Sequence, residues 1–567
     1  MKLKNILYSM MMGTAVLTGT TSCVSDLDQY PHTETTSKDV YTSLANYEAV
    51  LGKIYAAMVT SGQGKGGDNK DMESVLNNGS GFDYMRMFIN MQECGTDEFA
   101  STWLTGEQTT GLTYLSWDAN DAWVSDMYYR IYYNIALCNE FLRNANNANF
   151  SGADAEKMKE YKAEVRFMRA LFYYHALDFY RNIPMVTEND PVGSYIPPRY
   201  TPQQTFDYIE SELKDCVGDM LPASTCPYGQ ASQGAAYTLL AKLYLNSEVY
   251  TGVAKYAECK EACDKVMSMG YSLEDNYSKL FNADNDKRTN EIIFALPVSA
   301  EHTVSWGSST YLVCGQVSMS NANQNVADYG VTAGWSEFRL RPEFVDKFSQ
   351  TDIDGNGDRR CKFFTNGQSK DVTSMTDETA GYLSEKWSNL KDDGTTASNT
   401  ADAGVETDFP LFRLADVYLM YAECVVRSKD ANGNSLDWDP WNGGININDQ
   451  TVIESRKKGA IYWINLLRER AYGKDENGNP RGQVWKENFS SKEAFLQFIL
   501  DERARELYHE GYRRTDLIRY GQFTTNKYIW QWKGGTHDGQ AVDSKYNIYP
   551  IPNTELTANP NLHNDNY

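Results

Sequence analysis

The longest regular patterns of apolar and polar residues along this chain have the spacing of α-helices. One apolar stripe of residues 161–180 consists of Tyr161, Val165, Met168, Phe172, His175 and Phe179. Apolar residues that recur every three or four positions form one face of a helix, and Pro184 lies just beyond the segment. We therefore predict a helix here, with His175 as a core residue on its buried side.

A pair of helices is predicted for residues 232–269, with Gly252 between them. Small alanines alternate with tyrosines and leucines in this segment, and a helix–turn–helix unit of roughly 34 residues is typical of tetratricopeptide-like packing. The segment 411–427 is apolar nearly all round, which predicts an interior helix. These features predict a mainly α protein built on tetratricopeptide-like helix pairs.

A further helix is predicted for residues 490–511. Ser490 and Glu493 have the spacing of a capping box at its start, and Gly511 would end it. Long stretches rich in Gly, Asn, Asp and Ser separate the helical segments, namely 61–82, 301–335, 350–408 and 429–450. Loops of this length in a compact protein tend to be functional. We expect them to form an irregular lobe, mainly from residues 61–120 and 271–410.

The N-terminal residues have the layout of an export signal. Lys2 and Lys4 precede an apolar core from about Ile6 to Leu17, which is too short to span a membrane, and small residues then precede Cys23. This predicts a lipoprotein signal peptide, residues 1–22, with Cys23 as the lipidated first residue of the mature chain. The alternative is an ordinary secretory signal with an incidental cysteine, since Thr20 stands where such signals usually have leucine.

Residues 23–567 contain no further segment that could cross a bilayer and no Pro/Ser/Gly-rich linker, so we expect one large body on a lipid anchor. Removing residues 1–22 takes away two lysines and changes the formal charge from −23 to −25. An acidic surface repels nucleic acid and disfavours anionic ligands. The 12 Trp, 39 Tyr and 22 Phe are unusual in so polar a chain, and Trp and Tyr are the flat platforms on which uncharged sugars stack.

The ten cysteines form no CxxC framework. With Cys23 lipidated, nine remain, and most are interpreted as small buried hydrophobes. The short spacing of Cys216 and Cys226 leaves a disulfide between them open.

Catalytic motifs are not supported. Residues 62–67 (GQGKGG) match GxGxxG but have no preceding strand and no following apolar helix, so they fail as a dinucleotide site. There is no Walker A, GxSxG or HExxH motif. A glycosidase needs only two suitably spaced carboxylates, and 76 acidic residues leave that alternative open.

One motif suggests a cation. The stretch TDIDGNGDRR places Asp352, Asp354, Asn356 and Asp358 at alternate positions around Gly357, as at the start of a calcium loop. The twelfth position is Phe363, so the bidentate Glu of an EF-hand is missing. The alternative is a surface turn rich in Asp and Gly. Three acids this close repel one another without a cation, so a structural Ca²⁺ is slightly favoured.

Several segments together resemble the SusD/RagB family of outer-membrane glycan-binding lipoproteins. The likeness lies in AEVRFMRALFYYHALDFYRNIPMV (163–186), LFRLADVYLMYAECVVR (411–427), ERARELYHEGYRRTDLIRYG (502–521) and YPIPNTELTANPNL (549–562). It covers essentially the whole mature chain. It implies a scaffold of tetratricopeptide-like helix pairs that carries an irregular glycan-binding lobe.

A closer resemblance, to the starch-binding members of that family, lies in residues 281–293, 306–315, 332–338 and 523–535. It implies an arc of three aromatic side chains, Trp103, Trp306 and Trp335, and Arg86 as a partner of sugar hydroxyls. Trp306 stands where the starch binder has tyrosine, and Gly106 stands where an asparagine is expected.

The resemblance implies a non-enzymatic, cell-surface lipoprotein that captures starch or maltooligosaccharide. Its implied partners are a SusC-like TonB-dependent outer-membrane transporter, and other surface glycan-binding lipoproteins and glycosidases of the same system. VSDLD, directly after Cys23, resembles an acidic export tag for the outer face of the outer membrane. Three alternatives stay open: a different glycan or a peptide as ligand, a surface glycosidase, and a structural lid for the transporter.

Overall fold

The computed structural model describes residues 37–62, 64, 71–72, 75–76, 82–399, 404–430, 432–440 and 450–567. The chain divides into two compact units, Met1–Val50 and Leu51–Tyr567. The first contains α2 (Ser37–Val40) and the start of α3 (Leu44–Ala56). Cys23 and the predicted signal peptide lie outside the described residues, so the lipid anchor stays a prediction.

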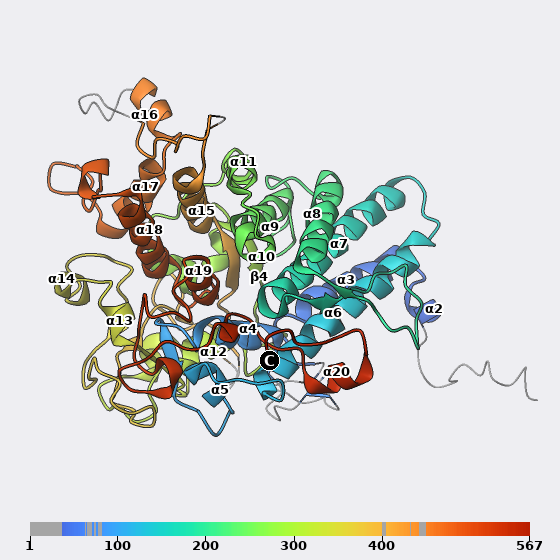
Figure 1. Ribbon diagram of the computed structural model, residues 1–567, viewed down its shortest axis with the longest axis horizontal. Coiled ribbons are helices and arrows are strands. Elements are labelled where there is room, and N and C mark those ends of the chain that lie inside the picture. The colour runs from blue at the N-terminus through green and yellow to red at the C-terminus, as the bar shows by residue number, and fades with distance from the viewer. Residues whose placement is uncertain are drawn as a thin grey trace, which may run out of the picture. The chain divides into compact units, whose positions relative to one another are not determined.

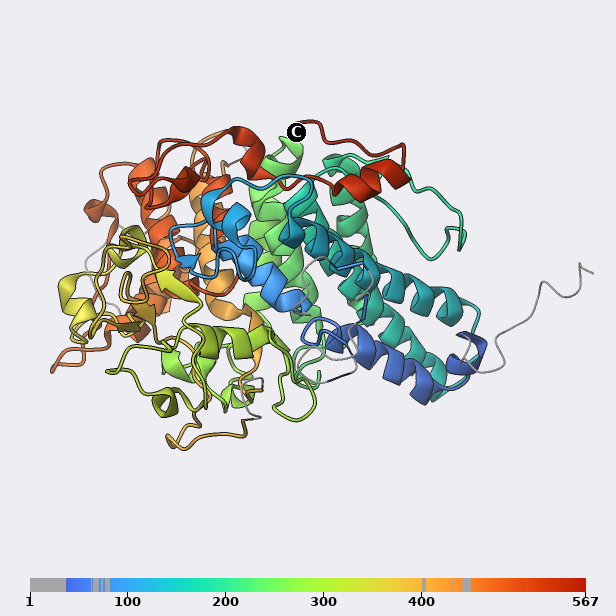
Figure 2. The same ribbon diagram turned by 90° about the horizontal axis from the view of Figure 1, so that it is seen from below.

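The second unit is built on paired helices (Figure 1). They are α4 (Tyr84–Glu93), α6 (Ala122–Asn146), α7 (Ala153–Tyr180), α8 (Pro202–Cys216), α9 (Gln233–Leu245), α10 (Ser247–Thr251), α11 (Tyr256–Met267), α15 (Leu414–Arg427), α17 (Ile461–Tyr472), α18 (Lys492–Leu507) and α19 (Arg513–Arg519). Helix α7 packs against α6 and α8, α9 against α11, and α15 against α11, α17 and α18. Figure 2 shows α6, α7 and α8 running alongside one another. The prediction of a mainly α, tetratricopeptide-like scaffold is confirmed.

Local sequence signals explain where these helices begin. Thr201 caps α8 through a reciprocal bond with Gln204, and Pro202 occupies the first turn, where its missing N–H costs nothing. All six residues of the stripe predicted on α7 are buried. His175 is a core residue, as predicted: its Nδ1 lies 2.6 Å from the Tyr84 hydroxyl, and burial lowers its pKa to about 3.

Two predicted helix boundaries are wrong. Residues Leu411–Arg413 belong to strand β8 (Phe409–Arg413), and α15 begins only at Leu414, because the backbone of this segment pairs with β4 (Ile292–Leu296). The N-cap of α18 is Ser491, not Ser490, and the helix ends at Leu507. It stops short of Gly511 because Tyr508 is extended and His509 has a positive φ of 57°.

The remaining elements are short. They are β1 (Phe99–Ser101), α5 (Thr110–Tyr114), β2 (Ile183–Pro184), β3 (Arg199–Tyr200), η2 (Val217–Asp219), η3 (Tyr277–Phe281), η4 (Asn285–Lys287), α12 (Ser308–Gly315), η5 (Val326–Tyr329), β5 (Phe338–Leu340), α13 (Pro342–Val345), α14 (Gln350–Ile353), β6 (Phe363–Phe364), β7 (Leu383–Ser384), α16 (Gln450–Arg456), η6 (Lys486–Asn488), η7 (Lys533–Gly535), η8 (Ser544–Asn547) and α20 (Asn553–Ala558). The strands form antiparallel pairs: β1 with β5, β2 with β3, β4 with β8, and β6 with β7. The β1–β5 pair joins the ranges 61–120 and 271–410, which the sequence assigns to one lobe.

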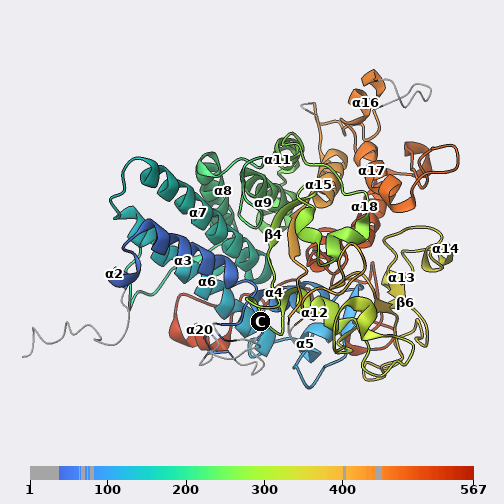
Figure 3. The ribbon, with the colours of Figure 1, turned by 180° about the vertical axis from the view of Figure 1, so that it is seen from behind.

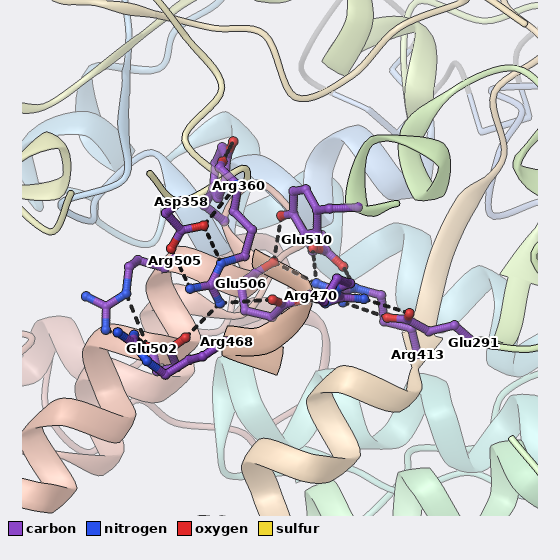
Figure 4. A network of polar contacts seen from close by, with 12 residues as sticks. Glu291, Asp358, Arg360, Arg413, Arg468, Arg470, Glu502, Arg505, Glu506 and Glu510 are labelled. Carbon is purple, nitrogen blue, oxygen red and sulfur yellow. Dashed lines mark hydrogen bonds and ion pairs between the residues drawn. The ribbon is translucent and has the colours of Figure 1, made fainter. Parts of the chain in front are cut away.

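A buried network of charged side chains connects the lobe to the helical scaffold (Figure 4). Arg413 of β8 bonds Glu506 of α18 at 2.7 Å and Glu510 at 2.7 Å, while Arg360 bonds Asp358 and Glu502. All of these side chains are buried. The arginines hold the pKa of Glu506 near 2 against the opposing effect of burial. Buried charges are tolerated only when they are paired in this way.

None of the nine cysteines in the described part of the second unit forms a disulfide bond. Cys216 donates to the carbonyl of Leu213 and Cys226 to the carbonyl of Gln230, so the disulfide left open between them does not form. Seven of the nine are buried, as expected for small hydrophobes. In the described ranges of the chain, no helix is both long and apolar enough to cross a membrane.

Candidate functional site

Three loops that are far apart in sequence bring the three predicted tryptophans together. Trp103 follows β1, Trp306 precedes α12, and Trp335 precedes β5. The ring centroids of Trp306 and Trp335 are 5.9 Å apart, with the planes tilted by 47°. The indole Nε1 of Trp103 donates to the carbonyl oxygen of Trp335 at 3.1 Å. Trp306 and Trp335 therefore form a tilted aromatic pair, and the Trp103 indole is tied to the backbone of this pair.

This surface is open to solvent at one end. Trp103 is 39% exposed and is the one tryptophan among the exposed large hydrophobic residues of the described chain. Trp306 and Trp335 are partly exposed. Figure 3 shows α12 and α5, which border these loops, on the same side of the second unit. The tryptophans are therefore neither buried core nor isolated surface residues.

Each tryptophan lies within five residues of a position with an uncommon backbone conformation. Ser308, Ser336 and Gln108 all have positive φ angles, of 48°, 52° and 59°. A residue other than glycine in this region costs about 1–3 kcal/mol and persists only where its surroundings enforce it. Ser336 is enforced by a hydrogen bond from the Met319 N–H to its Oγ at 2.6 Å. The arrangement is thus built into the fold.

Asp83 fixes the Trp306 loop to helix α4. Its carboxylate caps α4 by accepting from the Arg86 N–H at 2.8 Å. The same group accepts from the Ser305 hydroxyl at 2.5 Å and from the Ser308 N–H at 3.2 Å. One buried side chain therefore orients both the start of α4 and the backbone on either side of Trp306.

Arg86 lies beneath the tryptophans. Its Nη1 donates to the carbonyl oxygen of Trp306 at 2.7 Å, and its Nη2 donates to Glu107 and lies 3.5 Å from Glu337. Its guanidinium carbon is 3.8 Å from the centroid of the Phe82 ring. Burial would lower the pKa of Arg86, but the two carboxylates outweigh that effect and raise it. The arginine stays charged and ties together the loops that carry all three tryptophans.

The two carboxylates beside Arg86 come from the tryptophan loops themselves. Glu107 lies four residues after Trp103, and Glu337 lies two residues after Trp335. Burial raises the pKa of Glu337 well above its ordinary value; Arg86 opposes this shift and Glu107 adds to it. Arg86 lies against both carboxylates and supplies a positive charge to each. This balance explains how three ionisable groups are tolerated under an apolar surface.

Comparison with known proteins identifies the family. The chain is 32% identical to the starch-binding protein SusD of Bacteroides thetaiotaomicron, over 99% of both chains. The chain belongs to the SusD family. The family model described as "SusD family" matches residues 361–567, and one described as "Starch-binding associating with outer membrane" matches residues 27–245. A SusD-like protein of Formosa agariphila, P25, is 26% identical over 78% of each chain.

Solved structures of SusD-like proteins have the same fold. A SusD-like carbohydrate-binding protein from Bacteroides fragilis superposes with a TM-score of 0.67 at 19% identity, covering 92% of this chain and all of that one. A laminarin-binding SusD-like protein gives a TM-score of 0.63 at 20% identity, covering 92% of this chain and 99% of the other. Identities this low show a shared fold and nothing about the ligand.

The position of Arg86 corrects one expectation drawn from the SusD-family resemblance. The resemblance implies that the guanidinium bonds sugar hydroxyls, but Arg86 is only 2% exposed. Both Nη atoms bond protein groups below the aromatic surface. Its place in this SusD-family protein is that of a positioning residue. Gly106, where an asparagine was expected, lies exposed in the loop after Trp103.

The acidic loop does not fit a calcium ion. Asp352 uses Oδ2 to cap α14 and Oδ1 to accept from the Asp358 N–H at 2.6 Å, and Asp358 pairs with Arg360. A Cβ at Gly357 would lie 1.9 Å from Asp352 Oδ1, so the glycine is needed for this closure. Within the described ranges, no three acidic, His or Cys side chains are grouped to hold a metal. Asp354 accepts from the Gln350 side chain, and the Asn356 side chain donates to the Asp354 carbonyl oxygen, so both residues are engaged in local hydrogen bonds.

Glu107 and Glu337 are not recognisable as site residues in the sequence. The only signal for them is their closeness to Trp103 and Trp335 in a chain with 76 acidic residues, which is too common a pattern to single them out. Their shared contact with Arg86 depends on three loops meeting, which no local pattern reveals.

Proposed function

We propose that this protein is a cell-surface lipoprotein that captures α-glucan, such as starch or maltooligosaccharide, and passes it to a SusC-like TonB-dependent transporter. The observation that carries the proposal is the convergence of Trp103, Trp306 and Trp335 from three separate loops into one tilted aromatic surface. The relation to a protein named for starch binding supports the choice of α-glucan.

Recognition would work by shape. An α-glucan chain curves and exposes the apolar C–H faces of its sugar rings, which match tilted indole rings, while its hydroxyls face water. Each stacking contact is weak because water competes for both partners, so affinity depends on several contacts made at once by a surface that needs no rearrangement. The enforced backbone at Ser308 and Ser336 supplies that preorganisation.

Binding without catalysis is the activity this geometry supports. A glycosidase places two carboxylates on either side of the bond that it cleaves. The two acids closest in sequence to the tryptophans, Glu107 and Glu337, face Arg86 beneath the aromatic surface instead. Membership of the SusD family supports the same conclusion.

The cellular setting follows from the predicted N-terminus and the family. Lipidation of Cys23 would anchor the protein, and the match of residues 27–245 to a family described as starch-binding and associating with the outer membrane supports that membrane. The proposed partners are the SusC-like transporter and the other surface glycan-binding lipoproteins and glycosidases of the same system.

Affinity electrophoresis in amylose tests the site. We expect Trp103→Ala and Trp335→Ala to abolish retention while the melting temperature changes little for the exposed Trp103. Trp485→Ala is the matched control, because this half-buried tryptophan stacks on Arg456 of α16. Unchanged retention of the first two variants would refute the site.

A calorimetric panel tests the ligand. We expect maltoheptaose to bind and levan, xylan and peptides not to bind. Binding of one of the others instead would keep the family function and change the ligand, and release of reducing sugar from starch by the pure protein would identify an enzyme. Association with the transporter without binding of any soluble glycan would indicate a structural lid.

A further inference from the structure

A second recess lies beside the exposed tryptophan. It is a cleft of about 330 Å³. One wall is the loop 102–106, and the other consists of Ser336, Met375, Thr376 and Glu378. Neither Trp306 nor Trp335 lines it, so it continues the aromatic surface beyond its Trp103 end.

The apolar part of this cleft is rigid. Met375 is 3% exposed and packs with Ala100 and Val372 in a small hydrophobic cluster that Leu104 also joins. The Trp103 ring is fixed by its hydrogen bond to the Trp335 carbonyl. A Cβ at Gly106 would lie 3.5 Å from Cε3 of Trp103 and meet nothing else within 4 Å. The absent side chain at Gly106 therefore leaves the six-membered ring of Trp103 accessible from the cleft.

The polar part of the cleft is a carboxylate held in place from one side. Glu378 Oε2 accepts from the hydroxyl of Ser336 at 3.2 Å and from that of Ser320, and its backbone carbonyl accepts from Arg339 at 3.1 Å. No described residue donates a hydrogen bond to Oε1 of Glu378. A half-buried carboxylate with one oxygen unoccupied is a strong acceptor for a hydroxyl donor. Its negative charge also disfavours an anionic ligand.

We propose that this cleft is a further subsite for one uncharged pyranosyl unit of the bound glycan. The sugar ring would stack on the six-membered ring of Trp103, and one of its hydroxyls would donate to Glu378 Oε1. The volume lies near the lower end of the range of about 300–1,000 Å³ for small-molecule sites, which suits a single sugar rather than a longer segment. The subsite rests on the proposed function and extends it: it makes affinity depend on chain length.

Calorimetric titration with maltotriose and maltoheptaose tests the subsite. The blocking variant is Gly106→Leu, whose side chain enters the cleft, and the hydroxyl-acceptor variant is Glu378→Ala. We expect each variant to raise the Kd for maltoheptaose about tenfold. This corresponds to a loss of roughly 1.4 kcal/mol of binding free energy. Binding of maltotriose, which the three tryptophans can hold alone, should change less than about twofold.

Two substitutions serve as matched controls. Gly218→Leu places the same side chain at an exposed glycine with nothing within 4 Å of its Cβ. Asp377→Ala removes an exposed acid that is next to Glu378 in sequence. Asp377 itself does not line the cleft. Both should bind the two ligands as the unaltered protein does.

The results separate this proposal from the function on which it rests. If Gly106→Leu and Glu378→Ala bind maltoheptaose normally, or lose both ligands equally, the subsite is refuted while α-glucan capture stands. If the unaltered protein binds neither ligand, the proposed function falls and the subsite falls with it.

Discussion

Replacing Arg86 with methionine tests whether this residue supports the aromatic surface or touches the sugar. Methionine keeps much of the side chain's length and apolar contact with Phe82 but removes the charge. The substitution would leave the Trp306 carbonyl without its donor and Glu107 and Glu337 without their cation. Removing one partner of a buried ion pair costs about 3–5 kcal/mol, because the other partner stays buried and uncompensated.

The matched control is Arg143→Met. Arg143 pairs with Glu140 one helical turn away at 2.8 Å, and its side chain is 28% exposed. Pairs of this kind contribute about 0–1 kcal/mol. Scanning calorimetry compares the two variants: at roughly 1–2 °C per kcal/mol for a chain of this length, Arg86→Met should lower the melting temperature by roughly 3–10 °C and Arg143→Met by about 1 °C.

The loss of stability in Arg86→Met should depend on pH. The pKa of Glu337 is already raised by burial, and removal of Arg86 raises it further. A carboxyl whose folded pKa lies above its unfolded pKa stabilises the fold at low pH and loses that contribution as pH rises through the folded value. Arg86→Met should therefore regain part of its stability as pH falls from about 7.5 to 5. A variant that loses amylose retention with an unchanged melting temperature would show that Arg86 contacts the sugar, and would refute this reasoning.

Two further predictions concern parts of the molecule outside the aromatic surface. A calcium chelator should leave the melting temperature and maltoheptaose affinity unchanged, because Arg360 already supplies the positive charge next to Asp358. A clear fall in either quantity would show that the acidic loop binds calcium. Burial lowers the pKa of His175 to about 3, against 6.5 for an ordinary histidine. Between these two pH values the unfolded chain binds a proton at this residue that the folded chain does not bind. The free energy of unfolding should therefore fall as pH drops from 6.5 toward 3. Calorimetry of His175→Gln, which can still bond the Tyr84 hydroxyl, should show a weaker acid dependence, and an equal dependence would contradict the assignment.

The scaffold could be predicted from local patterns because each helix carries its own signals. The stripe on α7, the separation of α9 and α11 near Gly252, and the apolar helix α15 all follow from residue spacing. The predicted start of α15 was wrong because the residues before it pair with another segment of the chain. Leu411–Arg413 reads as helix but pairs as strand β8 with β4, and a preference of a few tenths of a kcal/mol per residue does not outweigh a ladder of hydrogen bonds.

The acidic loop is a second case in which local sequence does not determine which groups come into contact. Asp352, Asp354, Asn356 and Asp358 have the spacing of a calcium loop, and spacing is all that a sequence displays. Arg360 lies only two residues beyond Asp358, but whether it points toward that carboxylate depends on the fold. In the structure it does, and the charge that a metal would supply is already present.

The sequence by itself determined the helical scaffold, because this depends on short-range periodicity. Motifs spread along the chain indicated the family, and the resemblance singled out the three tryptophans as candidate site residues. Only the tertiary structure decided what lies around the tryptophans. The buried place of Arg86 between Glu107 and Glu337, the backbone enforced at Ser308 and Ser336, and the cleft between Trp103 and Glu378 all arise where loops distant in sequence meet. Burial and charge pairing depend on contacts between these loops, so they cannot be predicted from any single segment.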